Sequence, residues 1–202
     1  MLAPNTYVHD RYLVVRAVDG AVYEALDMTS RAQVALKLLA GGARDGAWPK
    51  IEREAQALKA LRHPQLPAIL DYFREGEDAV VVSPFVAGES LAAAVGPGRA
   101  VPFERLIGYT EQMLDALEYL HQQSPPVLHR SIKPQNMLLD ASGTVKLVGL
   151  WPALVPPQPP VARPAGALGS SLQFMPPEQV QGAALEQRSD IYSLAASLYF
   201  LA

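Results

Sequence analysis

Polar side chains that could do chemistry gather in one short stretch, residues 129–136. It contains His129, Arg130, Ser131, Lys133 and Asn136. The lysine and the asparagine could contact an anionic ligand, and they could equally brace their own loop by hydrogen bonds. Magnesium prefers several hard oxygen ligands, commonly carboxylates, and the amide of Asn136 is a poor substitute for them. We therefore interpret Lys133 and Asn136 equally as ligand contacts and as braces of their own loop.

The elements that must position this stretch begin with strands and one helix. Apolar runs flank Asp19-Gly20, a pair typical of a type I′ hairpin turn. A later segment has apolar residues at helical spacing. The predicted elements are strands at 14–18, 21–26 and 33–39, a helix at 50–61, a turn at 75–78 and a strand at 79–82.

The remainder is predicted to be mainly helical. We expect a helix from near Pro102 to about Gln122, short strands around Leu138 and Val145, and a helix beginning near Asp190. Residues 152–164 contain six prolines, which is too many for a regular helix or strand. This strip is expected to be a disordered loop, a fixed cover or a polyproline ligand for a partner.

Composition limits the classes of function. Half of the 202 residues are hydrophobic and 18% are charged, so the chain should bury a substantial core. A net charge of −3 without a basic block gives no electrostatic case for nucleic acid. The lack of cysteine excludes disulfides and cysteine metal sites. No stretch predicts a membrane span or a signal peptide, so we expect a cytoplasmic protein.

Five motifs, in order, resemble those of bacterial-type serine/threonine protein kinases. They are VALK at 34–37, REA…LRHP at 53–64, HRSIKPQN at 129–136, MPPEQ at 175–179 and SDIYSL at 189–194. The resemblance covers roughly residues 11–202. It implies an α+β, two-lobed fold, with a small antiparallel-sheet N-lobe carrying one helix and a mainly helical C-lobe truncated near its central helix. The implied parts are an N-terminal extension (1–10), an N-lobe (11–82), a hinge (83–88) and a partial C-lobe (89–202) whose residues 149–178 form a proline-rich activation-like segment.

Two catalytic positions of that family are degenerate here. Ser131 replaces the aspartate that orients the acceptor hydroxyl, and Gly149 replaces the magnesium-binding aspartate. Loss of a general base alone typically costs ~10²–10⁴-fold in rate. The link Asp19-Gly20-Ala21 is also too short for a glycine-rich flap over a triphosphate. We therefore predict an inactive member, a pseudokinase, with no magnesium requirement and Asn136 as a metal ligand at most.

Other family positions are retained. Lys37 and Glu54 match the ion pair that holds the ATP phosphates, and Lys133 and Asn136 match loop residues near the nucleotide. The resemblance assigns Val22, Ala35 and Leu138 to the adenine pocket and Ser83 to the gatekeeper position, although such residues are more often ordinary core. No cofactor is required by this interpretation, and ATP or another nucleotide is a candidate ligand.

The resemblance also assigns scaffold roles. Leu58, His129 and Leu150 match an apolar column between the lobes, and Asp190 matches the carboxylate that holds the catalytic loop. Arg130 would normally pair with a phosphate, but residues 151–168 contain no serine, threonine or tyrosine. Glu178 is expected to lack the arginine partner it has in relatives.

These features predict a pseudokinase that acts as a binding or scaffolding module, through a protein partner or by self-association. One alternative is a weakly active serine/threonine kinase using the retained residues. Another is a nucleotide sensor that needs no metal.

Overall fold

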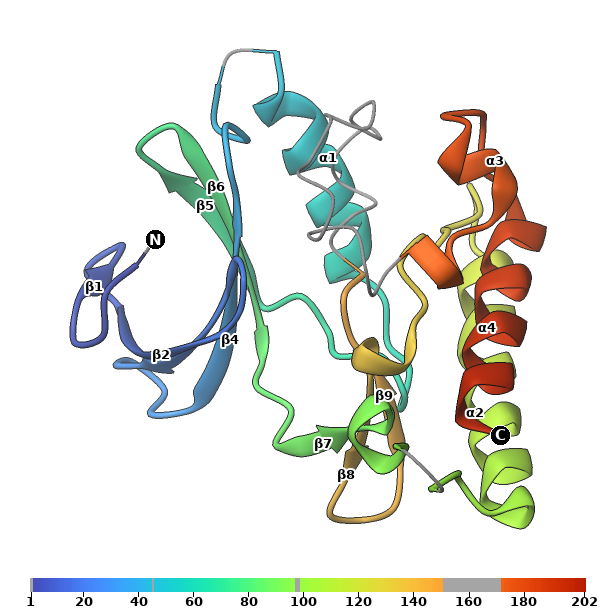
Figure 1. Cartoon of the computed structure of the whole chain (residues 1–202). Coiled ribbons are helices and arrows are strands. Elements are labelled where there is room, and N and C mark those ends of the chain that lie inside the picture. Colours follow the sequence, from blue (N-terminus) through green and yellow to red (C-terminus); the bar gives the residue numbers. More distant parts are fainter. Residues whose placement is uncertain (1, 45, 97–98, 151–171) are drawn as a thin grey trace. The chain divides into compact units, whose positions relative to one another are not determined.

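The computed structural model describes residues 2–44, 46–96, 99–150 and 172–202. They form two compact units. The first comprises Met1–Arg62 and Pro67–Val86, and the second comprises His63–Leu66 and Ala87–Ala202. The first unit is rich in strands and the second is mainly helical (Figure 1). The predicted proline-rich strip at 152–164 lies outside the described residues.

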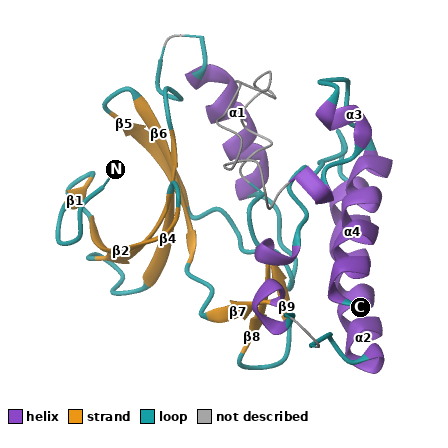
Figure 2. Ribbon diagram, in the orientation of Figure 1, coloured by secondary structure: helices purple, strands orange, loops and turns teal. Residues whose placement is uncertain are grey.

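The first unit is built on a six-stranded antiparallel sheet, which Figure 2 shows beside one helix. The strand order is β1-β2-β3-β4-β6-β5. The strands are β1 (Tyr7–Val8), β2 (Tyr12–Asp19), β3 (Val22–Asp27), β4 (Gln33–Leu39), β5 (Asp71–Glu75) and β6 (Asp78–Pro84), and the helix is α1 (Trp48–Lys59). Helix α1 buries Ile51, Ala55 and Leu58, which lie three or four residues apart.

The two faces of this sheet carry different residues because side chains alternate along a strand. One face holds the core, in which Tyr23 lies opposite Leu36 and Ala25 lies opposite Val34. The other face carries the residues between them in sequence. Its cross-strand pairs include Val22 with Lys37, Glu24 with Ala35, and Ala35 with Ser83.

The first hairpin differs from the prediction by one residue. Asp19 pairs with Val22, so the turn consists of Gly20 and Ala21 rather than Asp19-Gly20. A register irregularity between Ala17 and Asp19 extends β2 as far as Asp19. Gly20 adopts a φ of +49°, which glycine tolerates better than other residues. The link between the two strands is therefore as short as the sequence predicts, although its register is shifted.

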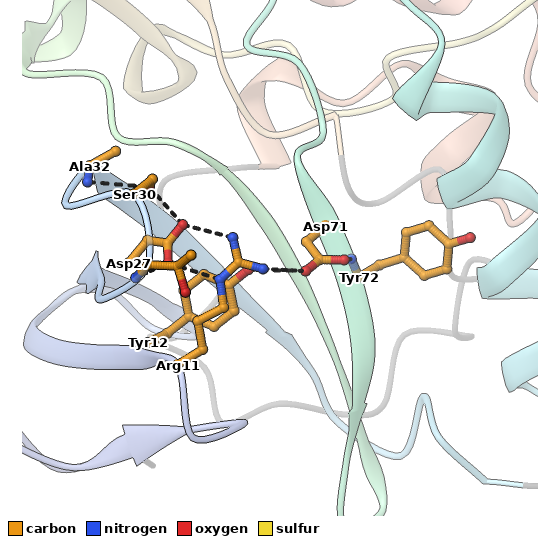
Figure 3. Close-up of polar contacts among 8 residues, drawn as sticks. Arg11, Tyr12, Asp27, Ser30, Ala32, Asp71 and Tyr72 are labelled. Atoms are coloured by element: carbon orange, nitrogen blue, oxygen red, sulfur yellow. Dashed lines mark hydrogen bonds and ion pairs between the residues drawn. The ribbon is translucent and has the colours of Figure 1, made fainter.

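An ion-pair network closes one end of the sheet (Figure 3). The Arg11 guanidinium donates from Nε and Nη2 to the two carboxylate oxygens of Asp27, at 2.8 Å each. Asp71 Oδ2 accepts from Tyr12 Oη at 3.1 Å and lies 3.4 Å from Arg11 Nη1. The bond from Arg11 holds the pKa of the buried Asp27 carboxyl well below its ordinary value. The network ties β2, the end of β3 and the start of β5 together.

The second unit is organised by two antiparallel helices, α2 (Phe103–His121) and α4 (Gln187–Leu201). They meet at both ends. Gln187 Nε2 donates to the carbonyl oxygen of His121, and Val101 N donates to that of Leu201. The other elements are β7 (Gly88–Ser90), β8 (Met137–Asp140), β9 (Val145–Leu147), helix α3 (Pro177–Val180), and single 3₁₀ turns at Leu91–Ala94, Pro134–Asn136 and Leu172–Phe174. Strands β7, β8 and β9 form a small antiparallel sheet.

No helix among the described residues has both the length and the apolar character needed to cross a membrane.

Candidate functional site

The loop that carries the polar stretch is held from one side by Asp190 of α4. Its Oδ2 accepts from the backbone N–H of His129 at 2.9 Å, and its Oδ1 accepts from the backbone N–H of Arg130 at 2.8 Å. His121 Nε2 lies 2.9 Å from Oδ2. Arg130 has a φ of +63°, an uncommon conformation for a residue with a side chain. The carboxylate therefore fixes the loop backbone at its most constrained point.

The pKa values of two groups in this region, Asp190 and His129, depart from their ordinary values. Asp190 is almost fully buried, which alone would raise its pKa. The hydrogen bond from His121, the nearby His129 and two backbone N–H groups outweigh that effect, so the pKa of Asp190 is lowered. Burial lowers the pKa of His129 to about 4. His129 is therefore neutral at pH 7, and its side chain is fully buried.

Ser131 and Asn136 bind each other directly. Asn136 Nδ2 donates to the backbone carbonyl of Ser131 at 2.6 Å and contacts its Oγ at 3.1 Å. Asn136 lies in the 3₁₀ turn Pro134–Asn136, and its backbone N–H donates to Lys133 O at 2.8 Å. The amide group of Asn136 thus closes the loop on itself.

Gly149 lies against the same amide. Its φ is +89°, and a Cβ atom built at this position would lie 2.7 Å from Asn136 Nδ2. Asn136 Oδ1 is the single side-chain oxygen that positions 136 and 149 offer. Magnesium prefers several hard oxygen ligands in octahedral geometry, commonly including carboxylates. A lone neutral amide does not fit that requirement. Among the described residues, no cluster of three or more His, Cys, Asp or Glu could hold a metal.

The second set of predicted site residues lies on the first unit. Val22, Ala35, Lys37 and Ser83 all project from the non-core face of its sheet, as their register requires. Ser83 is buried, and its hydroxyl donates to Pro84 O at 3.3 Å. Glu54 lies in α1 and is partly buried. These four residues therefore share one face of the sheet, and their contact with a nucleotide stays a prediction.

Two comparisons with known proteins identify the family. The sequence profile described as "Protein kinase domain" matches residues 18–202. The chain belongs to the protein kinase family. A probable serine/threonine-protein kinase of Streptomyces coelicolor is 35% identical over 191 residues, which cover 89% of this chain and 28% of that protein. PknB of Mycobacterium leprae is 31% identical over 185 residues, which cover 88% of this chain and 29% of the relative.

Solved kinase structures share the fold. A mutant form of the PknI kinase domain of Mycobacterium tuberculosis matches with a TM-score of 0.75 at 23% identity, over 100% of this chain and 76% of that one. Rad53 residues 1–466 in complex with AMP-PNP matches with a TM-score of 0.72 at 23% identity, over 95% of this chain and 48% of that one. These matches confirm the predicted kinase-like fold. The chain spans under a third of the length of the curated relatives named above.

Within this kinase fold, the predicted scaffold residues are mostly buried. Leu58, His129 and Leu150 are 4%, 0% and 9% exposed. Leu138 lies in β8 and Lys133 precedes the 3₁₀ turn, and both are partly buried. Asp140 serves the β8–β9 turn, where its Oδ1 accepts from the backbone N–H groups of Ser142 and Thr144. Hydrogen bonds, first that from Ser142, lower its pKa.

Glu178 has a partner that the sequence did not suggest. Ser189 Oγ donates to Glu178 Oε1 at 2.5 Å, while accepting from the backbone N–H of Glu186. This bond lowers the pKa of Glu178. Next to it, Gln179 Nε2 donates to Arg130 O at 3.3 Å, which connects α3 to the loop at residues 129–136. The capping pattern Glu186-x-x-Ser189 at the start of α4 was the available signal for Ser189.

Proposed function

We propose that this chain is a pseudokinase domain, a protein kinase fold that binds ligands or partners instead of transferring phosphate. The observation that carries the proposal is the arrangement of Ser131, Asn136 and Gly149. Position 131, which would orient the acceptor, offers only a hydroxyl. Of the two positions that would hold the metal, 136 offers a neutral amide already bonded to Ser131, and 149 has no side chain at all.

Phosphoryl transfer depends on positioning and charge neutralisation. When bound in active kinases, magnesium supplies that neutralisation. A serine hydroxyl accepts a proton much less readily than a carboxylate, so Ser131 provides little base strength. The deficits at 131 and 149 act on one transition state, and their effects need not multiply. Activity near background is the expected result.

The short first hairpin supports the same conclusion. In active relatives a glycine-rich loop between these strands covers the phosphates with backbone N–H groups. The link here is the two-residue turn Gly20-Ala21. Two residues form the turn itself and leave no backbone to fold over a triphosphate.

The binding role is supported by exposed apolar side chains on the helices of the second unit. Phe103 of α2 is 71% exposed and Tyr199 of α4 is 88% exposed. The backbone hydrogen bond from Val101 to Leu201 puts them at the same end of the helix pair. Contiguous exposed apolar patches mark interaction surfaces, whereas singly exposed apolar residues are common. We treat this end of the helix pair as the candidate contact for a protein partner or for self-association.

A nucleotide-sensing role is the second candidate. It is favoured by the common face of Val22, Ala35, Lys37 and Ser83, which combines apolar residues with a cation. This role requires no metal and no phosphoryl transfer, so it is compatible with the first.

Thermal unfolding with ATP, with and without magnesium, tests both roles. The proposal predicts the same melting temperature at a given ATP concentration whether magnesium or EDTA is present. ATP stabilisation in EDTA would support the sensor. Stabilisation that appears only with magnesium would contradict the proposed loss of the metal site.

A further inference from the structure

A row of aromatic and cationic side chains joins helix α1 to the edge strand β5 in the first unit. The guanidinium carbon of Arg74 lies 4.9 Å from the centroid of the Trp48 ring, and the ring centroids of Trp48 and Tyr72 lie 6.2 Å apart. Lys59 Nζ lies 5.9 Å from the Tyr72 centroid. Trp48 and Lys59 are the first and last residues of α1, so the row follows that helix for roughly 16 Å. We call these four residues the basic row.

The two cations of the basic row have aromatic partners and no carboxylate partner. Among the residues that the structure describes, no ion pair includes Arg74 or Lys59. Arg74 is exposed, and the other three residues are partly exposed. A ring attracts a cation through its quadrupole and leaves the positive charge uncompensated. The row therefore presents two positive charges beside two aromatic rings, and Arg, Trp and Tyr are the residue types that contribute most binding energy at protein interfaces.

Helix α2 of the second unit carries a stripe of the opposite sign. Its members alternate acidic and apolar side chains at three- or four-residue intervals, which places them on one side of the helix. They are Glu104, Ile107, Glu111, Leu114 and Glu118. All five are exposed, and they lie on the side opposite the buried residues of α2. We call this set the acidic stripe, and it spans roughly 21 Å.

The acidic stripe has no basic partners in the part of the chain that the structure describes. None of its three glutamates forms an ion pair there. Gly108, Asp115 and Gln122 stand four residues after these glutamates, so no stabilising i,i+4 pair with a cation forms. Arg105 is the one lysine or arginine of α2, and its position lies on a different side of the helix. The stripe therefore presents three unpaired carboxylates around two exposed apolar side chains.

We propose that the acidic stripe of one copy of this chain docks on the basic row of a second copy. The two surfaces are opposite in charge, both combine charged groups with apolar surface, and their lengths agree to within about one helical turn. Each copy carries one row and one stripe, so a two-fold dimer forms this contact twice. Complementary charges of this kind select the partner and speed its association. This inference rests on the binding role in the proposed function and names a second copy as the partner.

Sedimentation velocity of the full chain over a concentration series tests this contact. The wild type should form dimers, and their dissociation constant should rise roughly tenfold or more between about 0.1 M and about 1 M ionic strength, because salt screens exposed charges. A wild type that stays monomeric, or whose association does not respond to salt, would overturn the proposed contact. Either result would leave the pseudokinase proposal standing, since phosphate transfer tests that proposal separately.

Two charge-reversed variants test which surfaces meet. The row-reversed variant carries Lys59→Glu and Arg74→Glu, and the stripe-reversed variant carries Glu104→Lys, Glu111→Lys and Glu118→Lys. Each variant alone brings like charges together and should associate roughly tenfold or more weakly than the wild type. Mixed in equal amounts they should associate again, because every contact between the two variants then joins opposite charges. A mixture that stays monomeric, with both variants folded by circular dichroism, would contradict the proposed pairing.

Arg31→Glu combined with Arg188→Glu is the matched control. It changes the net charge by the same amount as the row reversal, at two exposed residues outside the basic row. This control should keep the self-association of the wild type. It should also bind the stripe-reversed variant more weakly than the row-reversed variant does. Equal binding would show attraction between net charges instead of a specific contact, and would overturn the proposal.

Discussion

Asn136 donates its side-chain amide to Ser131, at 2.6 Å to the backbone oxygen and 3.1 Å to the hydroxyl. Ser131, at the position of the catalytic base, is thus hydrogen-bonded to Asn136, the one retained residue at a metal-binding position. The same amide lies 2.7 Å from where a side chain at position 149 would begin. The two degenerate positions are therefore linked through Asn136.

Gly149→Asp should destabilise the protein, because the new Cβ would displace Asn136 from Ser131. Gly143→Asp is the matched control. Gly143 has a similarly positive φ of +81°, but nothing lies within 4 Å of its added Cβ. Differential scanning calorimetry should show a lower melting temperature for Gly149→Asp than for Gly143→Asp. Equal losses would mean that backbone conformation, and not the contact with Asn136, sets the cost.

Restoring both carboxylates, Ser131→Asp with Gly149→Asp, should recover little phosphoryl transfer. The two-residue turn at Gly20-Ala21 still provides no flap, and Asn136 must move to admit the new side chain. Initial rates with radiolabelled ATP and a generic protein acceptor test this expectation. A rate far above that of the wild-type chain would show that the short hairpin matters less than we infer.

His129 should make stability fall in mild acid. Its folded pKa of about 4 lies below the ordinary 6.5, because the fold excludes the charged form. Stability is therefore complete above pH 6.5 and decreases as pH falls toward 4, since only the unfolded chain takes up the proton. The free energy of unfolding should fall by up to about 1.4 kcal/mol per pH unit in this window.

Urea unfolding from pH 7 to 4 measures that slope. His129→Phe should reduce it, whereas His9→Asn should not. His9 is exposed, and its φ of +52° is one that asparagine tolerates. Identical slopes in the wild type and His129→Phe would contradict a neutral buried imidazole. Protonation of Asp190 also lowers the free energy of unfolding as pH falls. Its effect appears at lower pH than that of His129, because the pKa of Asp190 is lowered from 3.8.

The sequence predicted elements well where periodicity was strong and turn residues were distinctive. The strand at 33–39 and the two long helices are confirmed, with ends within about three residues. Strand β5 was missed because only Phe73 of its five residues is buried, so an edge strand leaves little alternation. The first turn shifted because an irregularity in β2 changes the register without changing the composition.

For the site residues too, the sequence indicated some contacts and missed others. The family resemblance implied that Asp190 holds the loop backbone, and in the structure its carboxylate accepts from the backbone N–H groups of His129 and Arg130. The resemblance could not reveal that Asn136 is bonded to Ser131 or that Ser189 donates to Glu178. Those facts depend on side-chain directions set by loop closure.

The network at Arg11 should contribute measurably to stability. Arg11→Gln leaves Asp27 buried with only Ser30 and Thr29 as hydrogen-bond donors. Because Arg11 is 39% exposed and therefore partly screened, we expect a loss of about 1–2 kcal/mol in the free energy of unfolding. Arg44→Gln, at the exposed pair with Glu77, should have no measurable effect. Chemical denaturation compares the two, and similar losses would show that Asp27 does not depend on Arg11.

Phosphate transfer from radiolabelled ATP to a protein acceptor, in the presence of magnesium, tests the central claim most directly. The chain and its Lys37→Met variant are measured side by side. We predict no incorporation above background in either, because neither a base nor a metal-binding carboxylate stands at 131 and 149. Incorporation by the wild type that disappears in Lys37→Met would contradict the account and make the chain an active kinase.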